Sequence, residues 1–364
     1  MGGFGWAARR VAQIFDDPRL GVDVVFLTGE LRGAPGQREA LVHGRRLLLR
    51  HPWAIAEVRR VRAERIDLLL VMDYRPNYRR ICWALPRTPM IVWVRDPRPP
   101  DDAAKVDTLR IPGTSARPQG IVQPDCHSLG TLARAARWLG RPLLFATPAP
   151  HLRDKLGRMI DMSIETLDLL PNPVDIAPGE VRKSERPRVV FLARLDPYKR
   201  PWLCVELARH FPDVEFLIAG KAHYRGDGAW EPNGLPPNCR LLGHIDGPEK
   251  VDVLSSAWVL VNTSIHEGGV AVSFLEALAG ETPLLACVEA GGLVERYGIY
   301  AGRFDGSGLD ALPSLTAGLK RLLADHPWRR TLGQEGRRWV AETHNPARFL
   351  EAFRGLCARA GVTW

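Results

Sequence analysis

The sequence predicts an α/β protein made of two doubly wound domains that face each other across a cleft. Three observations support this prediction: a length of 364 residues, short apolar runs that recur along the chain, and amphipathic stretches between them. A single hydrophobic core stops growing at about 250–300 residues, so this length favours two domains. Apolar runs of five or six residues separated by helices are typical of strands buried on both faces of a parallel sheet.

The first domain is predicted over residues 1–172. Its expected strands are the apolar runs 22–27, 67–72, 90–94, 120–123 and 143–147. Its expected helices are 38–63, 76–85 and 128–139. Alternation of strands and helices is the pattern of a parallel sheet covered by helices on both faces.

The second domain is predicted over residues 173–345, because four prolines interrupt the pattern within 169–187. Its expected strands are 188–193, 214–220, 239–243, 258–263 and 283–288. Helices are expected at 309–324 and 326–343, followed by a last helix from Pro346 to about Arg359. The C-terminal residues 346–364 are expected to return to the first domain.

Charge and composition narrow the classes of partner and compartment. The formal charge of +9 favours anionic ligands, but the basic residues are spread along the chain, so we do not expect a nucleic-acid-binding protein. Six widely spaced cysteines without a CxxC pair indicate neither a disulfide framework nor a metal site. With no signal-like or membrane-spanning run in the sequence, we expect a cytoplasmic protein that can touch the inner membrane face peripherally.

The stretch VVFLARLDPYKRP, residues 189–201, runs from an apolar strand directly into charged residues. Ligands of parallel sheets bind beyond the carboxyl ends of the strands, where Arg194 and Lys199 are expected. Asp196-Pro197 fits a turn that precedes a helix, and such a turn can direct both cations at one anion. The alternative is two solvated surface cations flanking a turn.

The stretch 258–288 combines a strand, a glycine loop and a helix expected from Val270 to Ala279. Gly268 and Gly269 permit close backbone approach, and the helix N-terminus offers N–H groups to an anion. Glu267 in the loop and Glu276 on the helix are suited to accept hydrogen bonds from sugar or ribose hydroxyls. The alternative is a capped helix with one surface and one buried-edge glutamate.

Together the two stretches resemble the retaining, nucleotide-sugar-dependent glycosyltransferases of family 4, which have the GT-B architecture. The matching segments are FLARLDPYKRP (191–201), LLGHI (241–245) and TSIHEGGVAVSFLEALAGETPLLA (263–286). The resemblance extends from about residue 170 to 345, whereas in the first half it rests on MGGFG and the order of the strands.

The resemblance implies a role for each matching residue. Arg194 and Lys199 would hold the diphosphate and Glu267 would contact the transferred sugar, which makes these three the catalytic set. Glu276 would bind the ribose. Further donor contacts are implied for Gly268, Gly269 and Val270 at the phosphates, for Gly243, His244 and Ile245 around the base, and for Gly2 and Gly3 from the first domain. No D-x-D motif occurs in the sequence, so no metal is expected.

The sequence departs from the family pattern at four places. Eight residues separate the two glutamates where the family has seven, and Ala193 replaces a usual glycine. The chain starts at the glycine loop instead of a strand, so either that edge is built differently or the start codon is placed late. Arg95-Asp96 stands where the family often has a histidine that meets the donor sugar.

Arg95 can therefore replace that histidine, bind a charged acceptor, or form an ion pair at the strand end. Together with Phe4, Arg95 and Asp96 are the residues assigned to the acceptor or the sugar. The expected partners are a UDP- or GDP-sugar and an acceptor that is a sugar, a lipid or a small molecule.

The sequence thus predicts a retaining, metal-independent hexosyltransferase without a cofactor, acting in cell-surface polysaccharide, glycolipid or small-metabolite glycoside synthesis. Two alternatives stay open. One is a sugar-nucleotide epimerase of the same fold, which would release nucleotide without an acceptor. The other is a catalytically silent scaffold or binding relative, which the altered glutamate spacing permits.

Overall fold

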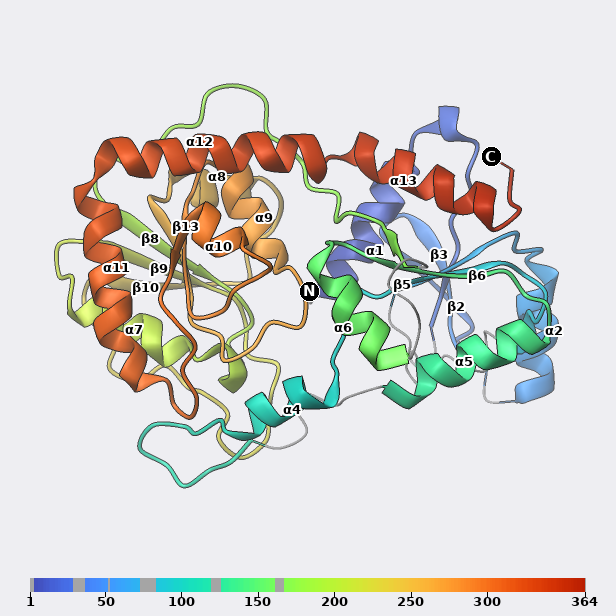
Figure 1. Cartoon of the computed structure of the whole chain (residues 1–364), viewed down its shortest axis with the longest axis horizontal. Coiled ribbons are helices and arrows are strands. Elements are labelled where there is room, and N and C mark those ends of the chain that lie inside the picture. The colour runs from blue at the N-terminus through green and yellow to red at the C-terminus, as the bar shows by residue number, and fades with distance from the viewer. Residues whose placement is uncertain are drawn as a thin grey trace. The chain divides into compact units, whose positions relative to one another are not determined.

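The computed structural model describes residues 3–28, 37–51, 53–72, 83–118, 126–160 and 167–363 (Figure 1). Contacts divide the chain into two compact units. Unit 1 consists of Met1–Pro99, Asp125–Pro173 and Pro346–Trp364, and unit 2 of Pro100–Pro124 and Val174–Asn345. Both units are discontinuous in sequence, and the segment 100–124 groups with unit 2 although the sequence suggests placing it in the first domain.

Unit 1 is built on a parallel sheet of four strands in the order β4-β5-β6-β7. The strands are β4 (Leu69–Val71), β5 (Met90–Trp93), β6 (Leu143–Thr147) and β7 (Asp168–Leu169). The helices are α1 (Gly3–Ile14), α2 (Ala54–Ala63), α5 (Cys126–Trp138), α6 (His151–Ile160) and α13 (Pro346–Arg359), and Pro18–Leu20 is a short 3-10 turn, η1.

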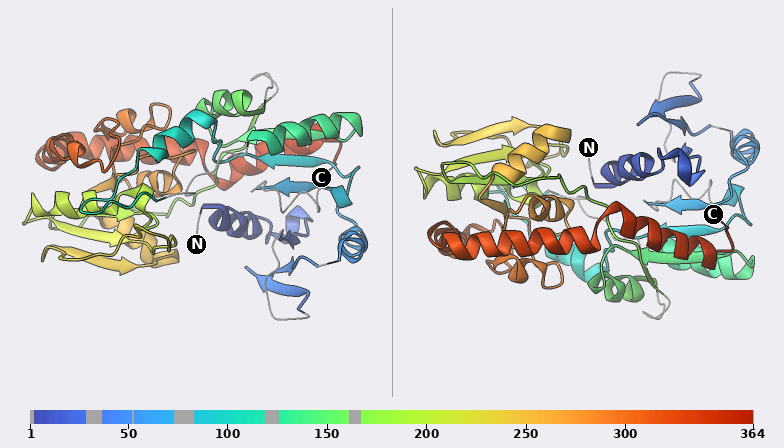
Figure 2. Two further views of the ribbon diagram at one scale, coloured as in Figure 1. Left: turned by 90° about the horizontal axis from the view of Figure 1, so that it is seen from below. Right: turned by 90° about the horizontal axis from the view of Figure 1, so that it is seen from above.

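Strand β5 shows why the sheet is covered on both faces. Met90 and Val92 pack with α2, α5 and α6, whereas Ile91 and Trp93 pack with α1 and α13. Alternate residues of a strand point to opposite faces, so a strand that is apolar at every position requires two helical layers. Figure 2 shows the strands between α5 on one side and α1 on the other. The prediction that the C-terminal helix returns to the first domain is confirmed.

The predicted helix over 38–63 is wrong in its first half. Residues 39–48 form an antiparallel hairpin of β2 (Glu39–Val42) and β3 (Arg45–Leu48), and only α2 is helical. His43 and Gly44 at the turn have φ angles of 52° and 74°, the backbone that a two-residue hairpin turn requires. β3 also pairs with β1 (Phe26–Leu27). Of the predicted strand 22–27, only these two residues form a strand. The predicted strand 120–123 and most of the predicted helix 76–85 lie outside the described residues.

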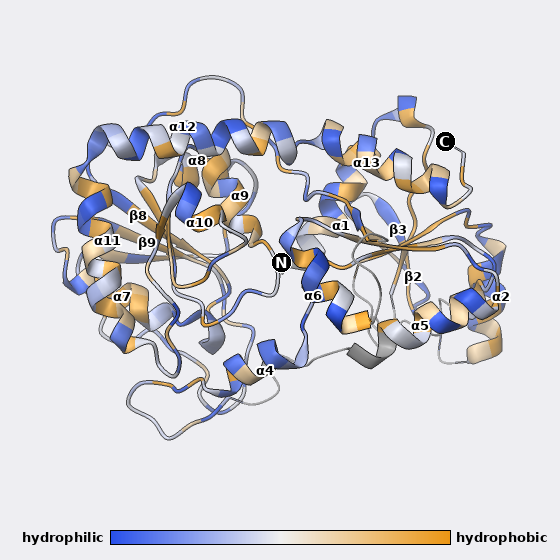
Figure 3. Ribbon diagram, viewed as in Figure 1, coloured by the Kyte–Doolittle hydropathy of each residue, from blue (hydrophilic) through white to orange (hydrophobic). Residues whose placement is uncertain are grey.

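Unit 2 contains a parallel sheet of six strands in the order β10-β9-β8-β11-β12-β13. The strands are β8 (Arg188–Leu192), β9 (Glu215–Ala219), β10 (Cys239–Gly243), β11 (Val259–Asn262), β12 (Leu284–Ala286) and β13 (Gly298–Tyr300). All five strands predicted for the second domain are confirmed, and β13 is an additional edge strand. In Figure 3 the strands β8 and β9 are mostly hydrophobic, whereas α11 and α12 carry both hydrophilic and hydrophobic residues.

The helices of unit 2 are α4 (Pro100–Asp107), α7 (Pro201–Arg209), α8 (Gly247–Ser256), α9 (Val272–Ala279), α10 (Leu293–Arg296), α11 (Leu312–Ala324) and α12 (His326–Thr343). Short 3-10 turns precede α7 and α11, namely η4 (Pro197–Lys199) and η5 (Leu309–Ala311). Side chains of α7 and α11 bury a common core against the sheet. The predicted helices 309–324 and 326–343 are confirmed.

Candidate functional site

The loops that follow β8, β10 and β11 all leave the carboxyl edge of the same sheet. β8 neighbours β11 directly, and β10 is separated from β8 by β9. Parallel strands present their carboxyl ends at one edge, where ligands of such sheets bind. The structure therefore brings the charged stretch after β8 and the glycine loop after β11 to one side of unit 2.

Arg200 joins these two stretches, a role that sequence reasoning missed. Its guanidinium is fully buried and donates hydrogen bonds to the carbonyl oxygens of Thr263 at 2.8 Å and Ser264 at 3.0 Å, and to that of Phe304 at 2.7 Å. Thr263 Oγ1 in turn donates to the carbonyl oxygens of Lys199 and Arg200, both at 2.9 Å. Arg200 has a φ of 47°, the left-handed region in which a non-glycine residue is strained.

Lys199 and Glu267 form a buried ion pair at the junction of the two loops. Lys199 Nζ contacts Glu267 Oε1, and only 11% and 14% of the two side chains are exposed. Asn262 Nδ2 and Ser264 Oγ donate further hydrogen bonds to the same carboxylate oxygen, at 3.0 and 2.8 Å. A buried charge needs such compensation, so this cluster holds the Glu267 carboxylate in one orientation.

The charges of this pair stabilise each other against desolvation. Burial lowers the pKa of Lys199, but the charge and hydrogen bond of Glu267 together with Tyr198 outweigh it and leave the pKa above its ordinary value. Burial likewise raises the pKa of Glu267, and Lys199 together with the hydrogen bonds from Asn262 and Ser264 brings it below its ordinary value. Both groups are therefore ionised at neutral pH.

Arg194 and Lys199 both make a cation–π contact with the ring of Tyr198. The Arg194 guanidinium carbon is 5.2 Å and Lys199 Nζ is 4.8 Å from the centroid of the Tyr198 ring. Arg194 also hydrogen-bonds the Tyr198 hydroxyl and lies 3.2 Å from Asp196 Oδ2. Its side chain is 41% exposed, so the structure gathers two cations of which Arg194 is the more open to solvent. The interpretation of these two residues as independent surface charges is not favoured.

Glu276 forms a second cluster through a lysine that the sequence did not single out. Lys250 Nζ of α8 lies 2.7 Å from Glu276 Oε1 and 3.5 Å from Asp246 Oδ1. Asp246 follows the predicted base loop, in which Gly243 has a φ of 69° and Ile245 is buried. His244 between them is exposed. Lys250 thus connects the loop assigned to the base with the glutamate assigned to the ribose, and each candidate glutamate is neutralised by its own lysine.

The loop 268–270 leads from Glu267 to the N-terminus of α9. The helix begins at Val272, two residues later than predicted, and its N-cap residue Ala271 makes no side-chain hydrogen bond. The first N–H groups of a helix have no partner within the helix. No side chain caps them, so the end of α9 that follows Gly268, Gly269 and Val270 can accept an anion.

The residues assigned in unit 1 have different surroundings. Gly2 lies outside the described residues, Gly3 opens α1, and Phe4 is in its first turn. Burial lowers the pKa of Arg95 to about 10. Its guanidinium donates to Asn172 Oδ1 at 2.9 Å and lies 5.0 Å from the Trp93 ring centroid. Asp96 pairs with Arg98. These contacts favour a structural role for Arg95 at the end of β5.

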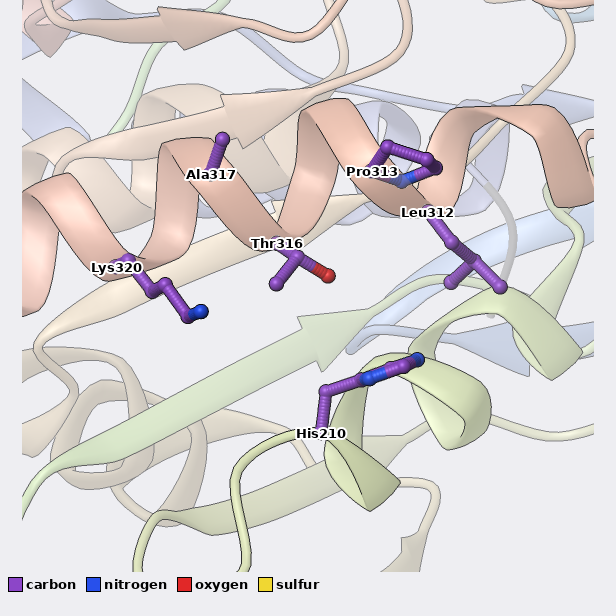
Figure 4. A pocket seen from close by; sticks show the side chains of 6 residues that line it. All are labelled: His210, Leu312, Pro313, Thr316, Ala317 and Lys320. Atoms are coloured by element: carbon purple, nitrogen blue, oxygen red, sulfur yellow. The ribbon is translucent and has the colours of Figure 1, made fainter.

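The pocket found in unit 2 does not coincide with the predicted residues. A pocket of about 360 Å³ lies between the end of α7 and α11 (Figure 4) and is lined by His210, Leu312, Pro313, Thr316, Ala317 and Lys320. Within the described ranges, no three His, Cys, Asp or Glu side chains are placed to hold a metal ion. In that same part of the chain, no helix is both long and apolar enough to cross a membrane.

Comparison with known proteins shows which family model and which folds this chain is similar to. Residues 175–339 match the family model described as Glycosyl transferases group 1. No curated protein matches the chain. Among solved structures, HepE from Anabaena in complex with UDP-glucose is similar over 98% of this chain and 96% of its own, with 14% identity and a TM-score of 0.67.

Two other solved structures show the same likeness. Sucrose-phosphate synthase from Thermosynechococcus elongatus is 18% identical, with 98% of this chain and 94% of its own covered and a TM-score of 0.67. A mutant of S. aureus TarM in complex with fondaparinux, alpha-GlcNAc-glycerol and UDP is 15% identical over 74% of this chain, with a TM-score of 0.52. The chain spans 50% of the length of that TarM. The chain therefore has the GT-B fold, and the family match within unit 2 supports a glycosyltransferase.

Proposed function

We propose that this protein is a retaining, metal-independent glycosyltransferase of family 4 that transfers a sugar from a nucleotide diphosphate sugar to an acceptor hydroxyl. The observation that supports this most is the gathering of Arg194, Lys199 and Glu267 at the carboxyl edge of the second sheet, with both cations on the Tyr198 ring. A diphosphate needs cations that are in place before the reaction, and this cluster supplies two of them.

In the proposed reaction the bond between the anomeric carbon and the diphosphate oxygen breaks, and a bond to the acceptor oxygen forms on the same face. The leaving diphosphate takes the proton of the acceptor hydroxyl. Negative charge grows on the diphosphate as the bond breaks, so Arg194 and Lys199 stabilise the transition state more than the ground state. Loss of one such contact raises the barrier by roughly 3 kcal/mol, by analogy with oxyanion-hole donors.

The two glutamates have separate tasks in this proposal. Glu267 accepts hydrogen bonds from hydroxyls of the transferred sugar, and Asn262 and Ser264 orient its carboxylate for that contact. Glu276, held by Lys250, accepts those of the ribose. A donor diphosphate would compete with Glu267 for Lys199, which would leave the Glu267 carboxylate available for the sugar.

Calorimetric titration with UDP, GDP and ADP tests the proposal at its first step. The HepE structure holds UDP-glucose and the TarM structure holds UDP, so UDP is the first nucleotide to test here. Nucleotide release from a panel of UDP-, GDP- and ADP-sugars then identifies the donor, and NMR of the product shows whether the anomeric configuration is retained. Failure to bind any nucleotide would favour a silent scaffold, and turnover without an acceptor would favour an epimerase.

A cytoplasmic location with peripheral membrane contact is also proposed, through the start of α2. Trp53 and Ile55 are 74% and 71% exposed there, and Arg59 of the same helix is exposed as well. Apolar side chains beside basic ones are suited to an anionic lipid surface. We expect the protein to sediment with vesicles that contain phosphatidylglycerol, and the Trp53→Ser, Ile55→Ser double variant to stay in the supernatant. Equal sedimentation of both proteins would exclude this face.

A further inference from the structure

Helix α4 packs against both loops of the candidate site, although Asp107 at its end lies 87 residues before Arg194 and 156 residues before Thr263 in the sequence. Val106, Leu109 and Ile111, from α4 and the turn after it, form one hydrophobic cluster with Ile265 of the glycine loop. Tyr198, Trp202 and Leu203 complete the same cluster. The segment 100–118 therefore packs against the two loops that carry Arg194, Lys199 and Glu267.

Asp102 is the polar centre of this contact. The residue is fully buried in the first turn of α4, and its two carboxylate oxygens face different partners. Oδ1 lies 2.5 Å from Lys105 Nζ of the same helix, whereas Oδ2 lies 3.7 Å from His266 Nε2. His266 is only 7% exposed. Lys105 compensates the charge of this buried carboxylate. The distance to His266 is longer than a hydrogen bond, and this close contact reaches the candidate site loop.

His266 immediately precedes Glu267, so a contact that fixes the imidazole of His266 also restricts the position of Glu267. Ile265 N donates to the carbonyl oxygen of Tyr198 at 2.9 Å, which fixes the residue on the other side of His266. The imidazole of His266 faces Asp102 of α4, and the next side chain, Glu267, contacts Lys199. A displacement of about 1 Å at a reacting group can cost on the order of a hundredfold in rate, so this support can matter for turnover.

We propose that Asp102 is a positioning residue of the candidate donor site, which acts on Glu267 through His266. The inference rests on the proposed function. A merely structural role is the competing explanation, because a carboxylate in the first turn also stabilises a helix through its dipole. The two explanations differ in whether the effect of Asp102 depends on His266.

A double-mutant cycle with Asp102→Asn and His266→Gln distinguishes them. Asp107→Asn, an exposed carboxylate in the last turn of the same helix, is the matched control. Wild type is first titrated with UDP, GDP and ADP, and kcat and KM are then measured with the sugar nucleotide that the donor panel identifies. We expect Asp102→Asn to lower kcat between about ten- and a hundredfold with a similar donor KM. The control should match wild type.

If Asp102 acts through His266, the double variant should be no slower than the slower single variant, because the second change removes an interaction that is already lost. Independent, multiplicative effects on kcat, or wild-type kcat in Asp102→Asn, would overturn the assignment while the proposed function stands. A wild type that binds none of the three nucleotides would overturn both. If Asp102→Asn does not fold, His266→Gln decides: a lowered kcat supports the assignment and an unchanged one refutes it.

Discussion

Lys199 and Glu267 combine a role in folding with their proposed role in catalysis. Removing one member of a buried ion pair leaves an uncompensated charge, which costs roughly 3–5 kcal/mol. We therefore expect Lys199→Met to lower both the melting temperature and the turnover. Adding Glu267→Gln removes the orphaned charge, so the double variant should recover most of the stability but stay at least about a hundredfold slower than wild type. Thermal unfolding and nucleotide release measure the two effects, and wild-type turnover in the double variant would refute the catalytic role.

Lys250 makes the assignment of Glu276 testable without an acceptor. Its Nζ lies 2.7 Å from Glu276 Oε1, so Lys250→Met releases that carboxylate. We expect the affinity for UDP to fall about tenfold, the loss of one charge-assisted hydrogen bond. The affinity for 2′,3′-dideoxy-UDP, which lacks the ribose hydroxyls, should change little.

Lys320→Met on α11 is a suitable control, because that side chain is exposed. Calorimetry of both variants with both nucleotides separates a local from a general effect. An equal loss for the two nucleotides in Lys250→Met would contradict a ribose contact at Glu276.

At the scale of the secondary-structure elements, Lys183 ties the chain that precedes β8 to the end of α9. Its Nζ donates to Gly280 O at 2.7 Å and Thr282 Oγ1 at 2.8 Å. Burial lowers its pKa from 10.5 to about 7, which outweighs the opposing effect of Glu281. Between these two pH values the unfolded chain binds the proton that the folded chain has lost. The stability therefore rises with pH across that window.

We accordingly expect the free energy of unfolding of wild type to rise from pH 7 to 9 relative to that of Lys183→Met. One lysine can contribute at most about 1.4 kcal/mol per pH unit. Urea unfolding of both proteins at several pH values measures the difference. Parallel pH profiles would show that Lys183 titrates with its ordinary pKa.

The elements that sequence reasoning predicted correctly are those with a strong apolar period. Residues 188–192 and 259–262 read as buried strands because each is covered on both faces. The hairpin 39–48 was mistaken for a helix because its apolar residues also fit a helical period, and the turn His43-Gly44 was not recognised. β13 (Gly298–Tyr300) was not predicted because its segment contains no run of aliphatic residues, whereas the equally short β12 lies in the apolar run 283–288.

The same reasoning explains which site residues could be predicted. Arg194, Lys199 and Glu267 lie next to recognisable strands and glycines, so their loops could be identified. Arg200 and Lys250 could not, because their partners lie 63 and 26 residues away in the sequence, and nothing in the local pattern reveals these pairs.

For the whole molecule, the two discontinuous units show how long-range contacts limit sequence reasoning. A composition break near Pro173 indicated one boundary, and the contacts place the end of a unit 1 segment at this proline. The grouping of 100–124 with unit 2 depends on side-chain packing around Tyr198 and Trp202, which no local pattern reveals. The return of α13 to the first domain was expected from the GT-B resemblance, and its apolar side packs there with α1 and β5.

A crystal structure of the complex with UDP tests most directly whether unit 2 binds a nucleotide diphosphate between the charged stretch after β8 and the glycine loop after β11. We expect the diphosphate oxygens within hydrogen-bonding distance of Arg194 and Lys199, with Lys199 drawn away from Glu267. The ribose should lie at Glu276. UDP bound elsewhere on the chain, or a complex in which Lys199 keeps its contact with Glu267 and touches no phosphate oxygen, would contradict the proposed function.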